Sequence, residues 1–228
     1  MRLLEKLYII PVCLIFLLGA CATTQPSDDA DQFEMRDPIK PLNQTIFAFN
    51  LGFDRYLLRP VAHAYHHVPD WGRTGVSNFF SNLHEPSNMV NGVLQLDPDI
   101  FFVSFSRFTL NSTIGLLGLR DVATEDGLVY QDQDFDKTLG RYGVGQGFYT
   151  VIPVLGPSTV RGTVGQIADS FLDPVDLFLT TQQSIALGVA EGISERDDND
   201  DVINHLYYES LDPYAATRAT FLQYNELK

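Results

Sequence analysis

Asp-Pro dipeptides constrain the fold of this chain more than any other feature. An aspartate accepts hydrogen bonds from the free N–H groups at a helix start, and proline suits the first helical position because its missing N–H costs nothing there. Repeated starts of this kind predict a mainly α-helical protein, although we expect some of them to be plain turns. The dipeptide recurs at Asp37-Pro38, Asp97-Pro98, Asp173-Pro174 and Asp212-Pro213, and Glu85-Pro86 is a weaker version.

Apolar residues at helical spacing support this prediction. Leu42, Ile46 and Phe49 recur at steps of three and four residues, and we expect their helix to end before Pro60. Together with the Asp-Pro starts, this spacing indicates an α-rich body of one domain, residues 37–228. The other predicted helices cover residues 86–96, 99–119, 158–172, 174–193 and 213–228, the last capped by Asp212.

The segment 99–119 is long and nearly all apolar, with Arg107 near its middle. An arginine at the centre of a bilayer is costly, so a simple membrane span is disfavoured. The hydroxyl and amide groups in the segment fit a helix with one apolar side and one side facing a polar cavity. A buried core helix fits the periodicity equally well.

Glycine is dense in residues 140–156, beside aromatic side chains such as Tyr142 and Phe148. This density disfavours a stable helix and predicts a hairpin or a bent loop. We expect positive φ at one or more of Gly143, Gly145 and Gly147. The stretch does not match a nucleotide-binding loop, because no Gly-Lys-Ser/Thr ends it and the third glycine of the dinucleotide pattern is missing.

The N-terminus has the pattern of a lipoprotein signal peptide. An apolar run too short to span a bilayer leads into Leu18-Gly19-Ala20-Cys21, where small residues precede the cysteine. We therefore expect residues 1–20 to be removed and Cys21 to carry diacylglycerol and N-acyl groups. Ala22 favours the outer membrane over retention at the inner one. The alternative is an ordinary signal peptide with a chance cysteine.

The segment after the cysteine and the charge of the chain limit its partners. Residues 21–36 are polar and acidic and are predicted to form a flexible tether. The whole chain has a net charge of −14, and removing residues 1–20, which carry +1, leaves −15. This charge argues against nucleic acid as a partner. Cys13 leaves with the signal peptide, so no disulfide and no cofactor-binding thiol is expected.

The sequence lacks the motifs of common catalytic sites. No Gly-x-Ser-x-Gly motif is present, so no catalytic residue is assigned. His63, His66 and His67 could share a metal with His84 or Glu85, but a metalloprotease needs glutamate where Ala64 stands. Surface or interfacial histidines are the simpler interpretation. We therefore expect neither a metal nor an enzymatic activity.

The run from Thr138 to Gly145 is the most specific block of a set of segments that extends from about Asp37 to Leu222. In these segments the chain resembles a known family, MlaA, also called VacJ. One departure is Gly162, where an acidic residue is expected, and residues 124–136 match the family little. Other matching segments are Asn43–Phe47, Phe49-Asn50, Arg59-Pro60, Ser77–Phe79, Asn82-Leu83, Glu85-Pro86, Asn91, Arg107-Phe108, Leu110–Ser112, Gly115–Asp121, Pro153, Gly156–Ser158 and Asp212–Tyr214.

The resemblance implies a fold and a role. The fold is a ring of amphipathic helices embedded in the bilayer around a polar channel, with a Gly-rich hairpin beside it. The role is removal of phospholipid from the outer leaflet of the outer membrane and its transfer to a soluble periplasmic carrier, in association with a trimeric porin. The residues that the resemblance assigns to the channel and hairpin are Tyr142, Gly143, Gly145, Gly147, Phe148, Pro153 and Arg161.

Two other functional classes stay open from the sequence. One is an outer-membrane phospholipase, which the missing nucleophile motif disfavours. The other is a structural envelope lipoprotein that tethers the outer membrane to the cell wall, and such a protein needs a body that lies in the periplasm.

Overall fold

The computed structural model describes residues 37–175 and 178–226, so Cys21, the signal peptide and the tether lie outside the described residues. The described chain is mainly helical. Its elements are α4 (Lys40–Phe53), η1 (Asp54–Leu58, a π-helical turn), α5 (Arg59–Tyr65), α6 (Asp70–Leu94), α7 (Pro98–Thr113), α8 (Val122–Glu125), α9 (Phe135–Arg141), β1 (Tyr149–Ile152), β2 (Gly156–Thr159), α10 (Val160–Leu172), α11 (Thr181–Asp198), α12 (Asp200–Asn204), η3 (His205–Glu209, also π-helical) and α13 (Pro213–Glu226).

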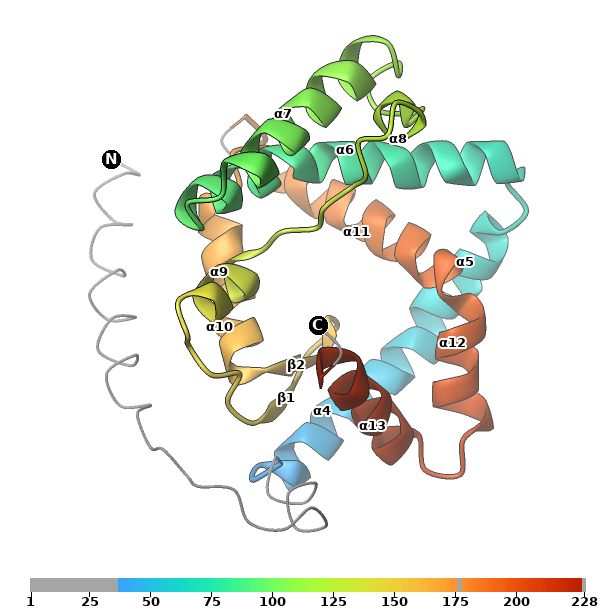
Figure 1. The fold of residues 1–228 in the computed structure, drawn as a ribbon. Coiled ribbons are helices and arrows are strands. Elements are labelled where there is room, and N and C mark those ends of the chain that lie inside the picture. The colour runs from blue at the N-terminus through green and yellow to red at the C-terminus, as the bar shows by residue number, and fades with distance from the viewer. Residues whose placement is uncertain (1–36, 176–177, 227–228) are drawn as a thin grey trace. The chain divides into compact units, whose positions relative to one another are not determined.

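Packing contacts between these elements close a circuit, as predicted for a ring. The helix α4 packs on β1, both strands pack on α10, and α10 packs on α9 and α6. The helix α6 packs on α11, α11 on α5, and α5 continues through η1 back to α4. Figure 1 shows these helices arranged around a common centre, with α7 lying along α6. None of the described helices combines the length and the apolar content needed to cross a membrane.

Two of the Asp-Pro dipeptides begin helices as predicted. The Asp97 side chain accepts hydrogen bonds from the backbone N–H groups of Asp99 and Ile100 at the start of α7. Asp212 accepts one from Ala215 N at 3.0 Å at the start of α13. Local capping chemistry therefore decides both of these boundaries.

The other dipeptides do not begin helices at their acidic residue. Ile39, not Asp37, is the residue before α4, and it makes no side-chain cap. Asp173 accepts from Val175 N in a turn, and α11 begins only at Thr181, after a capping box at Thr180. Glu85-Pro86 lies in the interior of α6, so the predicted start there is wrong.

Helix ends also differ from the prediction at two places. The first helical run continues past Pro60 because the π-helical turn Asp54–Leu58 precedes it and places the proline in the first turn of α5, where its missing N–H is tolerated. The run predicted to reach residue 119 ends at Thr113, because Leu116 and Leu117 have φ of 55° and 60°.

The two strands form an antiparallel hairpin that pairs Tyr149 with Thr159 and Ile152 with Gly156. Val154 stands in its turn with φ of 69°. The glycine-rich stretch therefore divides into the end of α9, a loop and this hairpin. Gly143, Gly145 and Gly147 lie in the loop before β1, not in the hairpin turn.

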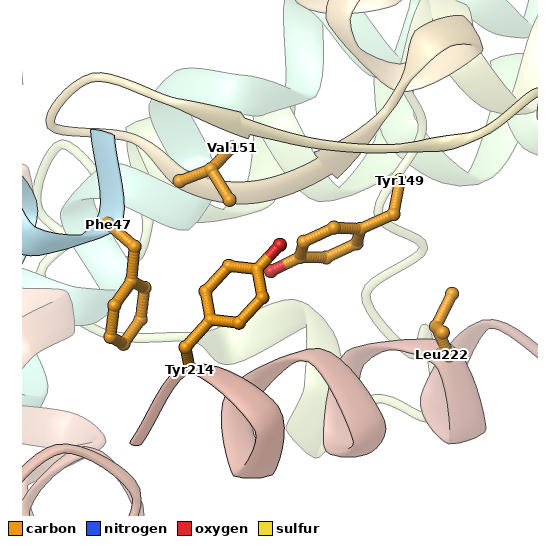
Figure 2. Close-up of a cluster of buried hydrophobic side chains, with 5 residues drawn as sticks. All are labelled: Phe47, Tyr149, Val151, Tyr214 and Leu222. Carbon is orange, nitrogen blue, oxygen red and sulfur yellow. The ribbon is translucent and has the colours of Figure 1, made fainter. Parts of the chain in front are cut away.

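The hairpin contributes to a small apolar core with α4 and α13. Figure 2 shows its five buried side chains, from Phe47, Tyr149, Val151, Tyr214 and Leu222. The rings of Phe47 and Tyr214 meet edge to face with centroids 5.6 Å apart, a favourable geometry for aromatic pairs. This core fixes the hairpin against both ends of the described chain.

Candidate functional site

The interior of α6 and α7 is polar, whereas much of their surface is apolar. Phe102 and Phe105 of α7 are 62% and 51% exposed. In soluble proteins the residues most often fully buried are apolar, and charged residues are almost never fully buried unless paired. The largest fully buried side chains of the described residues are Arg107, Tyr149, Glu85, Asn43, Asn88, Asn91, Asn111, Thr138 and Ser104.

Arg107 is the centre of the first polar cluster. Its guanidinium pairs with Glu85 of α6 at 2.5 Å and with Asp121 at 3.1 Å, and it donates to Thr124 Oγ1 at 2.9 Å and to the Leu128 carbonyl. The helix α7 thus has an apolar exposed side and a polar side, and the polar cavity of the sequence interpretation stays a prediction. Its polar side faces this buried network of charged partners.

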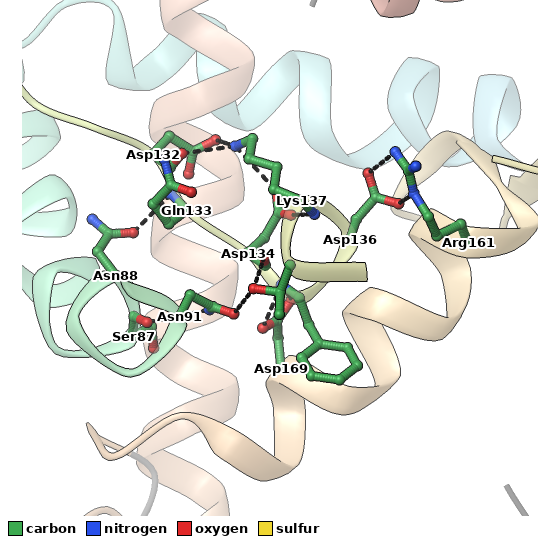
Figure 3. Close-up of polar contacts among 12 residues, drawn as sticks. Ser87, Asn88, Asn91, Asp132, Gln133, Asp134, Asp136, Lys137, Arg161 and Asp169 are labelled. Carbon is green, nitrogen blue, oxygen red and sulfur yellow. Dashed lines mark hydrogen bonds and ion pairs between the residues drawn. The ribbon is translucent and has the colours of Figure 1, made fainter. Parts of the chain in front are cut away.

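A second polar cluster joins α6 to the segment that leads into α9, as Figure 3 shows. Gln133 N donates to Asn88 Oδ1 at 2.9 Å, and Thr138 Oγ1 donates to Asn91 Oδ1 at 2.8 Å. Lys137 pairs with Asp132 at 2.6 Å. Asp132 and Gln133 belong to residues 124–136, where the family resemblance is weak, whereas Asn91 and Thr138 lie in segments that match the family.

Arg161 lies against the glycine loop. Its guanidinium pairs with Asp136 at 2.6 Å (Figure 3). It also donates to the Val144 carbonyl at 2.8 Å. Gly162 stands where the resemblance leads one to expect an acidic residue, and Asp136 supplies the carboxylate that pairs with Arg161. A β-carbon at Gly162 would lie 2.8 Å from Ser158 Oγ, so the tight approach of β2 favours glycine.

Polar contacts hold the loop between α9 and β1 at both of its ends. Arg141 pairs with Asp97 at 2.7 Å, and this guanidinium holds the pKa of the Asp97 carboxyl below its ordinary value. Tyr142 OH donates to the Leu94 carbonyl at 2.6 Å. At the other end, the Phe148 carbonyl accepts from Val160 N at 3.1 Å. Predicted site residues Tyr142 and Phe148 thus bracket the glycines.

The three glycines differ from one another. Gly143 and Gly147 have φ of +81° and +72°, which agrees with the expectation of positive φ at one or more of them. A β-carbon at Gly147 would also lie 2.9 Å from Val160 Cβ. Gly145 has no neighbouring atom within 4 Å of its β position. Pro153, the remaining predicted residue, follows β1 at the start of the hairpin turn.

Two asparagines of α4 hold the hairpin. Asn43 donates from Nδ2 to the Tyr149 carbonyl at 3.0 Å and accepts from Val151 N at 3.0 Å. Asn50 donates to the Ile152 carbonyl at 2.9 Å and accepts from Val154 N at 2.7 Å. Each side-chain amide therefore pairs with the strand as a neighbouring strand would.

The spacing of these two asparagines fits the strand. They are seven residues apart on α4, a rise of about 10 Å, and three residues of extended strand also span about 10 Å. Neither residue was predicted to have a role. The signal that could have found them is two asparagines seven positions apart on the same helical face as the apolar Phe47.

The histidines do not gather into a metal site. His66 Nδ1 lies 2.8 Å from Asp197 Oδ1, and Arg73 also pairs with Asp197. Burial opposes ionisation of Asp197, but the hydrogen bonds from Arg73 and His66 outweigh it and hold its pKa below the ordinary value. His63 and His67 stack with ring centroids 5.8 Å apart. The structure places no group of three metal-ligating side chains together among the described residues.

Comparison with known proteins identifies the family. A family model described as "MlaA lipoprotein" matches residues 35–228. The chain belongs to the MlaA family. It is 40% identical over 215 residues to the "Intermembrane phospholipid transport system lipoprotein MlaA" of Escherichia coli K12, covering 91% of this chain and 82% of that protein. The protein of the same name from Haemophilus influenzae is 29% identical, over 94% of this chain and 89% of its own.

A solved structure also matches the fold. It is described by the words "Structural basis for maintenance of bacterial outer membrane lipid asymmetry" and has 40% sequence identity to this chain, with a TM-score of 0.71. The match covers 84% of this chain and 98% of that one. The mainly helical single domain predicted here is therefore that of an MlaA-family protein.

Proposed function

We propose that this chain is an outer-membrane lipoprotein that removes mislocalised phospholipid from the outer leaflet and so maintains lipid asymmetry. The observation that carries this proposal is the inverted packing of the ring, with Arg107, Glu85 and several asparagines buried and Phe102 and Phe105 exposed. The names of the E. coli relative and of the matching solved structure support the same role.

The inverted packing suits lipid transfer by simple physical means. Exposed apolar side chains are stable in contact with acyl chains, whereas backbone and polar side chains need partners within the protein. A polar channel through the ring would let a charged headgroup move without leaving a polar environment. No covalent step is needed, so the proposed role is transport without catalysis.

The proposal places the protein at the periplasmic face of the outer membrane, anchored through acyl groups on Cys21. The lipoprotein signal pattern that ends at Cys21 supports this anchor. Three acyl chains would bind a membrane far more strongly than one. Phospholipid, a trimeric outer-membrane porin and a periplasmic phospholipid carrier are the proposed partners. The printed name of the relatives, a phospholipid transport system, supports the lipid and the pathway.

We propose further that the loop holding Gly143, Gly145 and Gly147 bends during transfer. Open space at the β positions of Gly143 and Gly145 supports this motion. A Gly145→Pro variant, or a disulfide across the loop, should then block lipid removal while the protein is still acylated and reaches the outer membrane. Normal lipid asymmetry in a clamped, fully expressed variant would show that the loop is a fixed turn.

The deciding experiment measures surface-exposed phospholipid in cells that lack this protein, with and without the gene restored. We expect exposure to rise in its absence and to return to normal on restoration. Purified protein should leave labelled phospholipid intact. Release of fatty acid or lysolipid would instead support a phospholipase, and unchanged surface phospholipid would support a structural lipoprotein.

A further inference from the structure

Arg55 and Arg59 differ from the other arginines in the described part of the chain. Neither pairs with a described carboxylate, and both are exposed. In a chain with a net charge of −14, unpaired cations side by side need an explanation. The other described arginines all pair with a carboxylate, namely Arg73, Arg107, Arg120, Arg141, Arg161, Arg196 and Arg218.

The two guanidinium groups are held at one place by a single tyrosine. Their central carbons lie 5.4 Å (Arg55) and 4.3 Å (Arg59) from the centroid of the Tyr208 ring. Tyr208 is itself fixed, because its hydroxyl donates to Asp54 Oδ2 at 2.6 Å. A cation over a fixed aromatic ring loses less side-chain freedom when it binds an anion, and stacking leaves the edge of the guanidinium free to donate.

The helical run that carries this arginine pair also exposes apolar side chains. Tyr56, between the two arginines in the sequence, is 80% exposed, and Leu57 beside it is 52% exposed. Val61, one turn further along, is 41% exposed. Aromatic and basic residues with apolar neighbours are typical of the boundary between a bilayer and water.

We propose that Arg55 and Arg59 bind the phosphodiester of a membrane phospholipid whose acyl chains lie along Tyr56, Leu57 and Val61. Guanidinium groups match phosphate oxygens with paired N–H donors, which a lysine ammonium does not. The exposed apolar side chains favour a lipid over free phosphate as the source of the anion. The site does not depend on the transport role, because a bound lipid can be detected without any transfer.

Native mass spectrometry of the full acylated protein, released from detergent, tests this site. Beyond any lipid that both proteins hold in the proposed channel, phosphatidylglycerol should be retained at least tenfold less by the R55Q/R59Q variant than by the wild type. Arg120→Gln is the matched control for loss of an exposed arginine, because Arg120 pairs with Glu125 at 2.8 Å, and it should retain lipid as the wild type does. A diacylglycerol with the same acyl chains should not be retained at this site.

Further outcomes would overturn the proposal. Equal retention by the wild type and R55Q/R59Q would exclude the arginine pair. Equal retention of diacylglycerol would mean that the acyl chains alone bind, and displacement by equimolar inorganic phosphate would indicate a site for a free anion. The R55K/R59K variant keeps the charge and the fold, so wild-type retention by this variant would exclude a site specific for guanidinium.

Discussion

Gly147 shows how one backbone conformation restricts a residue. Its φ of +72° is strained for any residue with a β-carbon, and that atom would lie 2.9 Å from Val160 Cβ. We expect Gly147→Ala to lower the free energy of unfolding by roughly 1–3 kcal/mol. Gly145→Ala is the matched control, because its β position is open, and should change stability by less than about 0.5 kcal/mol. Equal effects in thermal unfolding would contradict this explanation.

The ion pair of His84 with Glu191 predicts that the stability of the fold depends on pH. The hydrogen bond to Glu191 raises the pKa of His84 above its ordinary value of 6.5. A raised pKa in the folded state means that the stabilisation is fully present below pH 6.5 and is lost as the pH rises through the higher folded value. We expect His84→Gln to remove this loss from a series of melting temperatures, whereas His205→Gln, at an exposed pair, keeps it.

At the scale of elements, α4 and the hairpin depend on Asn43 and Asn50. Replacing either by alanine leaves strand N–H and C=O groups without partners, which should cost about 1–3 kcal/mol. Hydrogen exchange should quicken at Val151 N for Asn43→Ala and at Val154 N for Asn50→Ala. Asn199→Ala, which loses only a bond to its own helix, should leave both amides protected. Unchanged exchange in the α4 variants would show that the core alone holds the hairpin.

Local signals made part of the fold predictable. Asp97 and Asp212 begin helices because their capping bonds join residues two or three positions apart. Glu85 failed as a helix start because its partner is Arg107, 22 residues away, and this contact keeps Glu85-Pro86 inside α6. Asn43 was missed as a site residue for the same reason, because its strand partner lies 106 residues away. The loop glycines could be predicted because the density of glycine in residues 140–156 is itself the signal and needs no distant partner.

At the scale of the molecule, the inverted packing predicts how the body partitions. A chain with Cys21→Ala, made without residues 1–20, lacks the acyl anchor but keeps the exposed apolar side chains of α7 and its neighbours. We expect it to partition into detergent or bilayers, since large exposed apolar patches mark membrane contacts. A monodisperse protein in buffer without detergent would contradict an embedded ring and favour a periplasmic body.

The polar filling of the α6 and α7 interior also has a thermal consequence. Unfolding usually raises the heat capacity by about 12–15 cal/mol/K per residue, because newly hydrated apolar surface outweighs hydrated polar surface, which has the opposite sign. Here unfolding hydrates buried arginine, glutamate and asparagine groups, while many large apolar side chains are already exposed. We therefore expect a smaller heat-capacity increment per residue than usual, and a plot of the free energy of unfolding against temperature that is less curved.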